Sequence, residues 1–152
     1  MLDQTRADSY TEFVEDVEPR LKHALAAALG PERGLEANAE ALAYGWEHWD
    51  RIRSMANPAG YLYRVGYRSG FKRWRPPHLP AVPVEEDPWV EPGLPRALSR
   101  LTARQRTTVL LIHAFGWTYA ETAEMLGVSI GTVETHVDRG LKKLRAQLGG
   151  VA

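Results

Sequence analysis

A proline-rich stretch divides this chain in two. From Pro76 to Pro95 the sequence contains seven prolines in twenty residues, and the periodic spacing of apolar residues disappears. Because proline lacks an amide N–H and fixes φ, no long helix or central strand passes through such a stretch. Four acidic residues and no basic ones lie within it. The sequence therefore predicts an extended acidic linker over residues 76–94, between small domains over residues 1–75 and 95–152.

Composition restricts the class of protein. At 152 residues with 44% hydrophobic content, the chain has the make-up of a folded globular protein. It contains no cysteine, which excludes a disulfide framework and a thiolate metal site and is typical of the reducing cytoplasm. No apolar run is long enough to span a bilayer, and the first residues lack the pattern of a secretion signal. We expect a cytoplasmic protein without membrane insertion.

The formal net charge is zero, but the charges are segregated along the chain. Residues 1–50 carry four basic and eleven acidic residues, and residues 51–75 carry seven basic and no acidic ones. Residues 76–95 carry only acids, four of them, and residues 96–152 carry eight basic against four acidic residues. One such block alone is typical of a solvated helix face. Four alternating blocks that coincide with the predicted boundaries favour two separate cationic surfaces.

Helical periodicity predicts three helices before the linker. The first carries apolar residues from Tyr10 to Leu29, with a kink or break at Pro19. The second is expected over residues 35–53, and the third begins after a capping Asn57, runs to Trp74 and is ended by prolines. The second helix is expected to turn four side chains inward: Leu42, Trp46, Trp49 and Ile52.

Capping residues predict four helices after the linker. They are expected to begin near Pro95 and to run over residues 103–115, 119–126 and 130–148. Thr102 and Thr118 each open a capping box, and Ser129 is a third N-cap. Gly116, Gly127 and Gly149 stand where left-handed C-caps are expected. With no strand pattern, the predicted fold class is all-α, with two small helical domains.

Residues 119–139 match a helix-turn-helix. Ala123 is small where two helices would cross, Gly127 allows a turn with positive φ, and Val133 packs the second helix back. A structural helical hairpin rarely meets all three conditions with correct caps. If Val133 and Val137 point inward, a base-reading face is predicted at Thr132, Thr135, His136 and Arg139. Phosphate contacts are predicted for Lys142, Lys143, Arg145, Arg104 and Arg106. Glu134 either accepts from a base, faces solvent or pairs with Arg139.

The third helix combines cations with aromatic rings. One stripe carries Arg64, Arg68, Lys72 and Arg75, and the next carries Tyr63, Tyr67, Phe71 and Trp74. Cations beside stacking rings are how proteins hold single-stranded nucleic acid. Tyr63 and Tyr67 are better explained as core residues, whereas the cations favour a DNA-facing stripe.

These motifs resemble a known family. Residues 98–106 (LSRLTARQR), 119–129 (YAETAEMLGVS) and 131–133 (GTV) look like the promoter-distal domain of bacterial RNA polymerase sigma factors of the extracytoplasmic-function group. Residues 57–65 (NPAGYLYRV) resemble the opening of that group's promoter-melting helix. The sequence departs from the pattern at Tyr61, Arg68 and Glu134, where tryptophan, asparagine and a basic residue are usual, and Gly66 and Gly70 are expected to weaken the helix by about 1 kcal/mol each.

The resemblance implies a set of partners and roles. The helix over residues 36–50 would dock on the clamp of core RNA polymerase through Glu40, Glu47 and Asp50. Further expected partners are the polymerase flap and an anti-sigma factor or other regulator. The loop over residues 51–56, with Arg53 and Ser54, would hold a flipped base of the minus-ten element, and Asn57 at the start of the next helix is a further expected minus-ten contact. Residues 64–75 would grip the melted strand, and the helix-turn-helix would read the minus-thirty-five element of promoter DNA.

Two other functions stay open. A quorum-sensing-type regulator shares the GTV-x-x-H pattern at residues 131–136, and a sigma-like protein could bind polymerase or an inhibitor without activating a promoter. An enzyme is not expected, because the five histidines lack metal-ligand spacing and no nucleophile–base pair or phosphate loop appears. We expect no metal and no cofactor.

Overall fold

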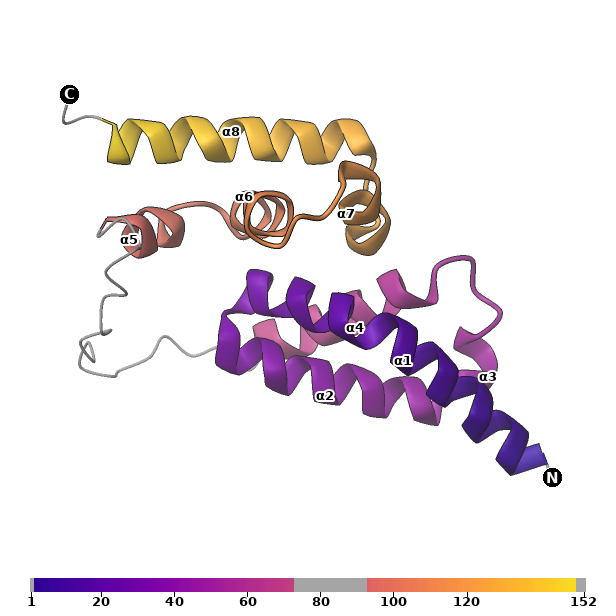
Figure 1. The fold of residues 1–152 in the computed structure, drawn as a ribbon. Helices are drawn as coiled ribbons and strands as arrows, with labels where there is room; N and C mark the ends of the chain where they lie inside the picture. The colour runs from indigo at the N-terminus through magenta and orange to yellow at the C-terminus, as the bar shows by residue number, and fades with distance from the viewer. Residues whose placement is uncertain (1, 73–92, 150–152) are drawn as a thin grey trace.

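A computed structural model describes residues 2–72 and 93–149, and every regular element within these two ranges is helical. We call the helices before the gap the first half and those after it the second half. The two halves form two layers, one above the other (Figure 1). The first half contains α1 (Leu2–Leu29), α2 (Pro31–Glu47), α3 (Trp49–Ile52) and α4 (Pro58–Lys72). The second half contains α5 (Leu94–Ser99), α6 (Ala103–Val109), the π-helical turn η1 (Leu110–Ala114), α7 (Tyr119–Leu126) and α8 (Ile130–Leu148). The all-α class is confirmed.

The hairpin of α1 and α2 is the base of the first half. Gly30 takes a φ of 91° between the two helices, and Pro31 starts α2. Beyond the turn the helices approach so closely that a Cβ at Gly34 would lie 2.5 Å from Ala26 Cα. The predicted break at Pro19 does not occur, because α1 continues through it as one helix.

The predicted helix over residues 35–53 is wrong at both ends. Helix α2 begins earlier, at Pro31, and ends at Glu47, after which His48 separates it from the short α3. This change of direction buries Trp49 and Ile52 but leaves Trp46 41% exposed, so the inward position predicted for Trp46 is also wrong. A single helical period could not anticipate which of the two tryptophans is buried.

Helix α4 packs against α1 and α2 through its glycines. A Cβ at Gly66 would lie 3.0 Å from both the Ala37 carbonyl oxygen and Leu25 Cδ1. Gly66 therefore allows two helix backbones to approach, and its helix propensity alone does not describe its effect on stability. Tyr63, on the same helix, is buried as predicted, but it faces the second half.

The second half follows its predicted helix boundaries closely. Thr102 forms a complete capping box with Gln105, Thr118 accepts from the Glu121 N–H, and Ser129 accepts from the Thr132 N–H. Gly116 and Gly127 have φ of 72° and 68°, as left-handed caps require. The left-handed cap predicted at Gly149 is wrong, because that residue has a φ of −91°. The predicted helix over residues 103–115 changes from α to π geometry at Leu110.

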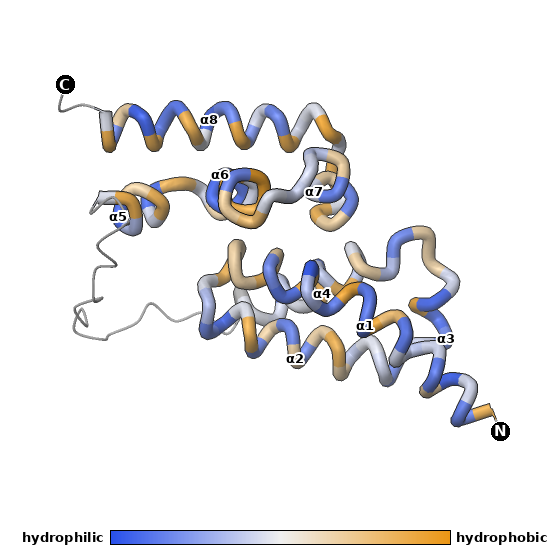
Figure 2. Tube along the Cα trace, viewed as in Figure 1, coloured by the Kyte–Doolittle hydropathy of each residue, from blue (hydrophilic) through white to orange (hydrophobic). Residues whose placement is uncertain are grey.

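The largest core cluster includes residues of both halves. It joins Leu21, Leu25 and Leu62 of the first half to Leu111, Trp117 and Met125 of the second. Two smaller clusters hold α8 onto α5, α6 and α7, and the apolar segments of α8 recur on the side facing these helices (Figure 2). The halves thus pack against each other, an arrangement that we call closed. The predicted linker lies almost wholly outside the described residues, and the division into domains stays a prediction.

The described ranges contain neither a membrane-spanning helix nor a metal-binding cluster. None of the helices in residues 2–72 and 93–149 is long and apolar enough to cross a membrane. The same residues contain no cluster of three or more histidines and carboxylates placed to hold a metal ion.

Candidate nucleic-acid interface

Helices α7 and α8 form a helix-turn-helix. The small Ala123 is buried where the helices meet, and Gly127 ends α7 in the left-handed conformation. Val133 is completely buried, and Val137 is 3% exposed beside it. The Gly127 N–H donates to the Glu124 carbonyl and the Val128 N–H to the Ala123 carbonyl, which completes the turn. All three predicted constraints are therefore met in one packed unit.

The outer face of α8 carries the predicted DNA-reading residues. Glu134, Thr135 and Arg139 are exposed, whereas Thr132 and His136 are half-buried. Thr132 is held in the N-terminal cap, since its hydroxyl lies 2.8 Å from Ser129 Oγ. No ion pair joins Glu134 to Arg139 in the described residues, which leaves the Glu134 carboxylate facing solvent.

The cations beyond this face have intramolecular contacts. Lys142 pairs with Asp138 at 3.1 Å across one exposed helical turn, and Lys143 donates to Gln105 Oε1 at 3.1 Å. An exposed pair such as Lys142–Asp138 contributes little to stability, so the Lys142 ammonium group can exchange it for a phosphate oxygen. Lys143 would have to give up a half-buried hydrogen bond to do the same. Arg104 is exposed nearby on α6.

A groove on α4 combines rings and guanidinium groups. It has a volume of about 470 Å³, and we call it the basic aromatic groove. Arg64 and Arg68 are exposed in it, and neither forms an ion pair within residues 2–72 and 93–149. Its lining residues come from α2 and α4: Tyr44, Tyr61, Arg64, Val65, Arg68 and Ser69.

Two residues that line this groove, Tyr44 and Tyr61, form a hydrogen-bonded cluster with Arg51. Arg51 Nη2 donates to Tyr44 Oη at 3.0 Å and lies 3.4 Å from Tyr61 Oη, with its guanidinium 5.7 Å from the Tyr61 ring centroid. Hydrogen bonds from Tyr44 and Arg51 hold the pKa of Tyr61 below its ordinary value. The cluster presents aromatic faces next to positive charge, which suits stacked bases of a single strand.

The loop before α4 contains the other predicted minus-ten residues. Arg53 and Ser54 are exposed, and Ser54 Oγ donates to the Arg51 carbonyl at 2.9 Å. Asn57 caps α4 by accepting from the Gly60 N–H at 3.0 Å, and its amide Nδ2 donates to the Glu124 carbonyl of α7 at 2.6 Å. The side chain of Lys72 and the whole of Arg75 lie outside the described residues.

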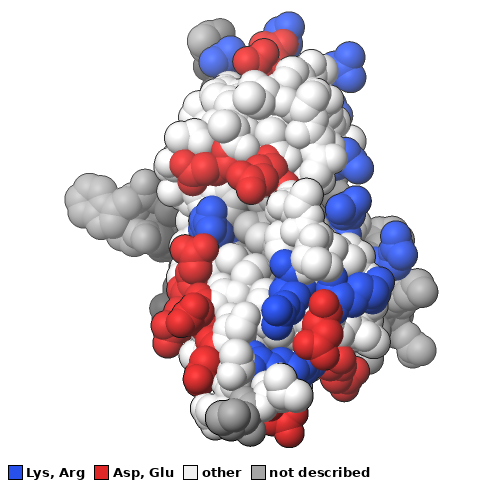
Figure 3. Space-filling view, turned by 90° about the vertical axis from the view of Figure 1, so that its right-hand side faces the viewer, with Lys and Arg blue, Asp and Glu red and all other residues white. Residues whose placement is uncertain are grey.

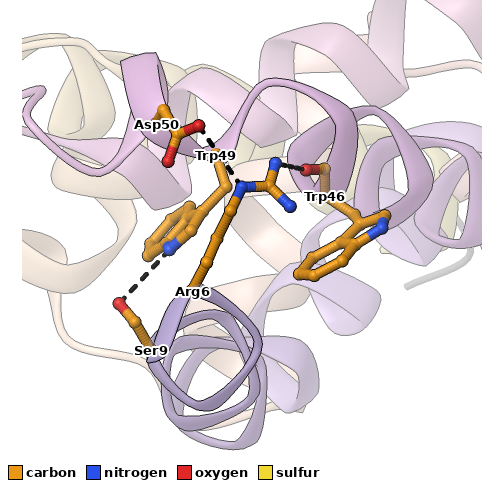
Figure 4. A network of polar contacts seen from close by, with 5 residues as sticks. All are labelled: Arg6, Ser9, Trp46, Trp49 and Asp50. Atoms are coloured by element: carbon orange, nitrogen blue, oxygen red, sulfur yellow. Dashed lines mark hydrogen bonds and ion pairs between the residues drawn. The ribbon is translucent and has the colours of Figure 1, made fainter. Parts of the chain in front are cut away.

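The predicted polymerase-binding acids lie on α2 and α3. Asp50 pairs with Arg6 at 3.4 Å, and Arg6 stacks over Trp46 at 4.2 Å and donates to its carbonyl (Figure 4). Trp49 Nε1 donates to Ser9 Oγ at 3.2 Å, which fixes α1 to the same corner. Glu47 is exposed at the end of α2, and Glu40 accepts from Ser69 Oγ. The Arg6 guanidinium thus lies between the Asp50 carboxylate and the exposed Trp46 indole.

Comparisons with known proteins relate this geometry to a family. The family model described as Sigma-70, region 4 matches residues 93–144, which include the whole helix-turn-helix. The RNA polymerase sigma-E factor of Streptomyces coelicolor is 34% identical over 119 residues, covering 71% of this chain and 67% of the relative. The chain belongs to the RNA polymerase sigma factors. The ECF RNA polymerase sigma factor SigM of Mycobacterium tuberculosis is 43% identical over 54 residues, which cover 36% of this chain and 28% of that protein. The predicted extracytoplasmic-function group is confirmed.

A solved structure shares the fold of this sigma factor. That solved structure is of the sigma factor RpoE from Bartonella quintana in complex with the anti-sigma factor NepR. The match has a TM-score of 0.64 and covers 95% of this chain and 99% of that chain, at 18% sequence identity.

The closed arrangement of this sigma factor engages several predicted DNA ligands. Arg106 donates to the Ala28 carbonyl at 2.9 Å, at the C-terminal end of α1. The Arg64 guanidinium carbon lies 3.8 Å from where a Cβ of Gly127 would stand, beside the end of α7. Asn57 donates to the same end of α7. Because the C-terminus of a helix carries partial negative charge, each half provides a substitute for phosphate oxygens.

Sequence reasoning missed Tyr44, which lines the basic aromatic groove, and Arg51, which donates a hydrogen bond to Tyr44. Tyr44 was not a candidate, although its ring and hydroxyl form part of the groove wall. Arg51 was included only as the first residue of a loop. The two residues belong to different helices that meet at His48, so no single helical period relates them. In Figure 3, basic side chains recur down the right-hand side of the face, and acidic ones gather on the left but also lie beside basic ones at the top and lower right.

The pH dependence of stability reports on the surroundings of His136. Burial, Arg104 and Arg139 together lower the pKa of His136, and Arg64 and Tyr63 of α4 line the same space. A histidine with a lowered folded-state pKa imposes no cost above about pH 6.5 and an increasing cost below it, because the unfolded chain then binds the proton more readily. We expect the Tm of the sigma factor to fall more between about pH 7 and 5 than the Tm of His136→Gln. Parallel curves for the two proteins in thermal unfolding would contradict this expectation.

Proposed function

We propose that this sigma factor binds core RNA polymerase and directs it to promoters through two DNA-contacting surfaces, one in each half. The observation that carries the proposal is the helix-turn-helix, whose buried face is complete while Thr135 and Arg139 on its outer face stay exposed. An exposed, capped recognition helix of this kind enters the major groove through its N-terminal residues. The role is in the cytoplasm and is not catalytic.

The second half would read the minus-thirty-five element. Thr132, Thr135, His136 and Arg139 would meet base edges, and Glu134 would accept from a base or remain in solvent. Arg104, Arg106, Lys142 and Lys143 would hold phosphates. Lys142 and Lys143 lie on the recognition helix itself, beyond its base-reading residues, and Arg104 and Arg106 lie on α6, which packs against that helix. Arg106 would first have to leave the α1 carbonyls that it contacts in the closed arrangement.

The first half would hold the melted minus-ten element. The basic aromatic groove supports this role, because Arg64 and Arg68 stand exposed beside the rings of Tyr44 and Tyr61. Arg53, Ser54 and Asn57 would contact the strand at the end of the groove nearest the loop. Lys72 and Arg75 would continue the contact with phosphates along the helix.

Polymerase would bind the first half through a separate set of side chains, the acidic residues of α2 and α3. Glu40, Glu47 and Asp50 are the proposed contacts with the polymerase clamp, and the second half would meet the flap. An anti-sigma factor or another regulator would bind the free sigma factor, as NepR is bound to RpoE in the related complex. The acidic linker over residues 76–94 would join the domains of residues 1–75 and 95–152.

Run-off transcription with purified core polymerase tests this function directly. Fragments of a genomic library are transcribed with and without the sigma factor, and transcripts that start at a shared sequence pattern are expected only when it is present. The sigma-like binding protein described above would associate with polymerase and produce no such transcripts. A regulator of the quorum-sensing type would bind DNA without core polymerase.

The salt dependence of DNA binding tests the groove. Arg68→Gln in the holoenzyme is expected to weaken binding to single-stranded minus-ten DNA and to reduce the slope of log affinity against log salt by about 0.7, the value for one lost phosphate contact. Arg96→Gln is the matched control, because Arg96 is an exposed arginine of α5 outside both surfaces. Fluorescence anisotropy at several salt concentrations measures both. Equal slopes for the two variants would remove Arg68 from the proposed site.

A further inference from the structure

A small pocket lies between the two halves and belongs to neither DNA surface alone. It has a volume of about 120 Å³ and opens where α4 meets α6, the end of α7 and the middle of α8. Tyr63, Leu126 and Val128 form its apolar walls, and Arg64, Arg104 and His136 provide its basic groups. An apolar cavity of roughly 150 Å³ holds one benzene ring. This pocket, at about 120 Å³, is somewhat smaller but open to solvent on one side, which limits its ligand to a single aromatic ring.

The charges around the pocket are all of one sign. No residue that lines it is acidic. The positive field of Arg104 and Arg139 reaches His136, whose pKa it lowers together with burial. Neither Arg64 nor Arg104 is ion-paired within the described parts of the chain. Two guanidinium groups beside an apolar pocket can bind a ligand that carries both a carboxylate and a ring. The guanidinium groups would donate charge-assisted hydrogen bonds to the carboxylate, and the pocket would bury the ring.

We propose that this pocket binds a small aromatic carboxylate, with its ring between Tyr63 and Leu126 and its carboxylate at Arg64 and Arg104. The walls come from both halves, so the ligand binds the closed arrangement and no other. Binding therefore shifts the equilibrium toward the closed arrangement, because a ligand stabilises the state for which it has the higher affinity.

The consequence for transcription rests on the proposed function. Arg64, Arg104 and His136 are all proposed DNA contacts, and the bound carboxylate occupies the cations that would otherwise meet phosphate or base edges. Ligand and promoter DNA then compete for the free sigma factor, and the ligand acts as an inhibitor of its DNA binding.

Calorimetric titration of the full chain with benzoate tests the pocket without DNA or polymerase. Benzoate is expected to bind one to one, with a dissociation constant of about 1 mM or tighter for so small a ligand. Benzyl alcohol, which has the same ring and no charge, is expected to bind at least about tenfold more weakly, since it lacks the charge-assisted contacts. Arg104→Gln is expected to weaken benzoate binding about tenfold for the same reason, and Arg96→Gln to leave it unchanged.

Any of three results would contradict the proposed ligand site. These are no heat of binding with benzoate, equal affinity for benzoate and benzyl alcohol, or equal affinity for benzoate in Arg104→Gln and Arg96→Gln. Thermal unfolding provides a second measurement, because benzoate is expected to raise the Tm of the parent chain and not that of Arg104→Gln, whose own Tm shows that it folds. Run-off transcription without benzoate is a separate assay. Normal transcripts together with absent benzoate binding would refute the pocket alone, and absent transcripts together with benzoate binding would refute the proposed function alone.

Discussion

Cross-linking position 23 to position 115 is expected to lower promoter-directed transcription by about tenfold or more, because it holds the sigma factor in its closed arrangement. His23 of α1 and Phe115 after η1 stack with ring centroids 4.5 Å apart and an angle of 12° between their planes, and both are exposed. In this arrangement Asn57 contacts the end of α7 and Arg106 contacts the end of α1. While Asn57 and Arg106 make these contacts between the halves, they are not available to bind the minus-ten and minus-thirty-five elements.

The absence of cysteine from the chain makes the experiment specific. His23→Cys and Phe115→Cys are introduced together and joined by a bismaleimide that contains a reducible disulfide. Run-off transcription is measured before and after reduction, with the two single variants treated identically as controls. Recovery on reduction is expected. Full activity of the cross-linked protein would mean that the closed arrangement does not prevent promoter recognition.

Replacing Gly34 by alanine is expected to destabilise the fold by about 2 kcal/mol, or roughly 4–8 °C in Tm, through overpacking. The added Cβ would lie 2.5 Å from Ala26 Cα, 2.6 Å from Ala26 N and 2.9 Å from the Leu25 carbonyl carbon. All three atoms are backbone, so relief requires a shift of α2 relative to α1. Helix propensity alone predicts the opposite sign, since alanine is favoured over glycine by about 1 kcal/mol in a helix.

Gly131→Ala is the matched control for this prediction. Gly131 lies in the first turn of α8, and a Cβ there would meet only Ser129 Oγ, at 3.9 Å. With space available, the alanine is expected to raise the Tm slightly through the lower entropy of the unfolded chain. Both variants are measured by thermal and urea unfolding. A rise in stability in both would show that the α1–α2 crossing tolerates a methyl group.

Local chemistry made the second half predictable. The caps at Thr102, Thr118 and Ser129 each join a side chain to the backbone three residues later, and Gly127 provides its own left-handed turn. Interactions within a few residues are complete in the linear sequence, so helix ends and the helix-turn-helix could be located from it. The first half contains fewer such signals, and the boundary near His48 was missed.

The amino-acid sequence by itself determined the all-α class, the helices of the second half and the residue types available for DNA contact. Tertiary structure alone decided that Trp46 is exposed and Trp49 buried, that Tyr44, Arg51 and Tyr61 form one cluster, and that Arg106 contacts α1. The physical reason is separation along the chain. A cap is formed between residues three apart, whereas the contact of Arg106 with Ala28 depends on how two complete helical layers pack, and no local pattern encodes that packing.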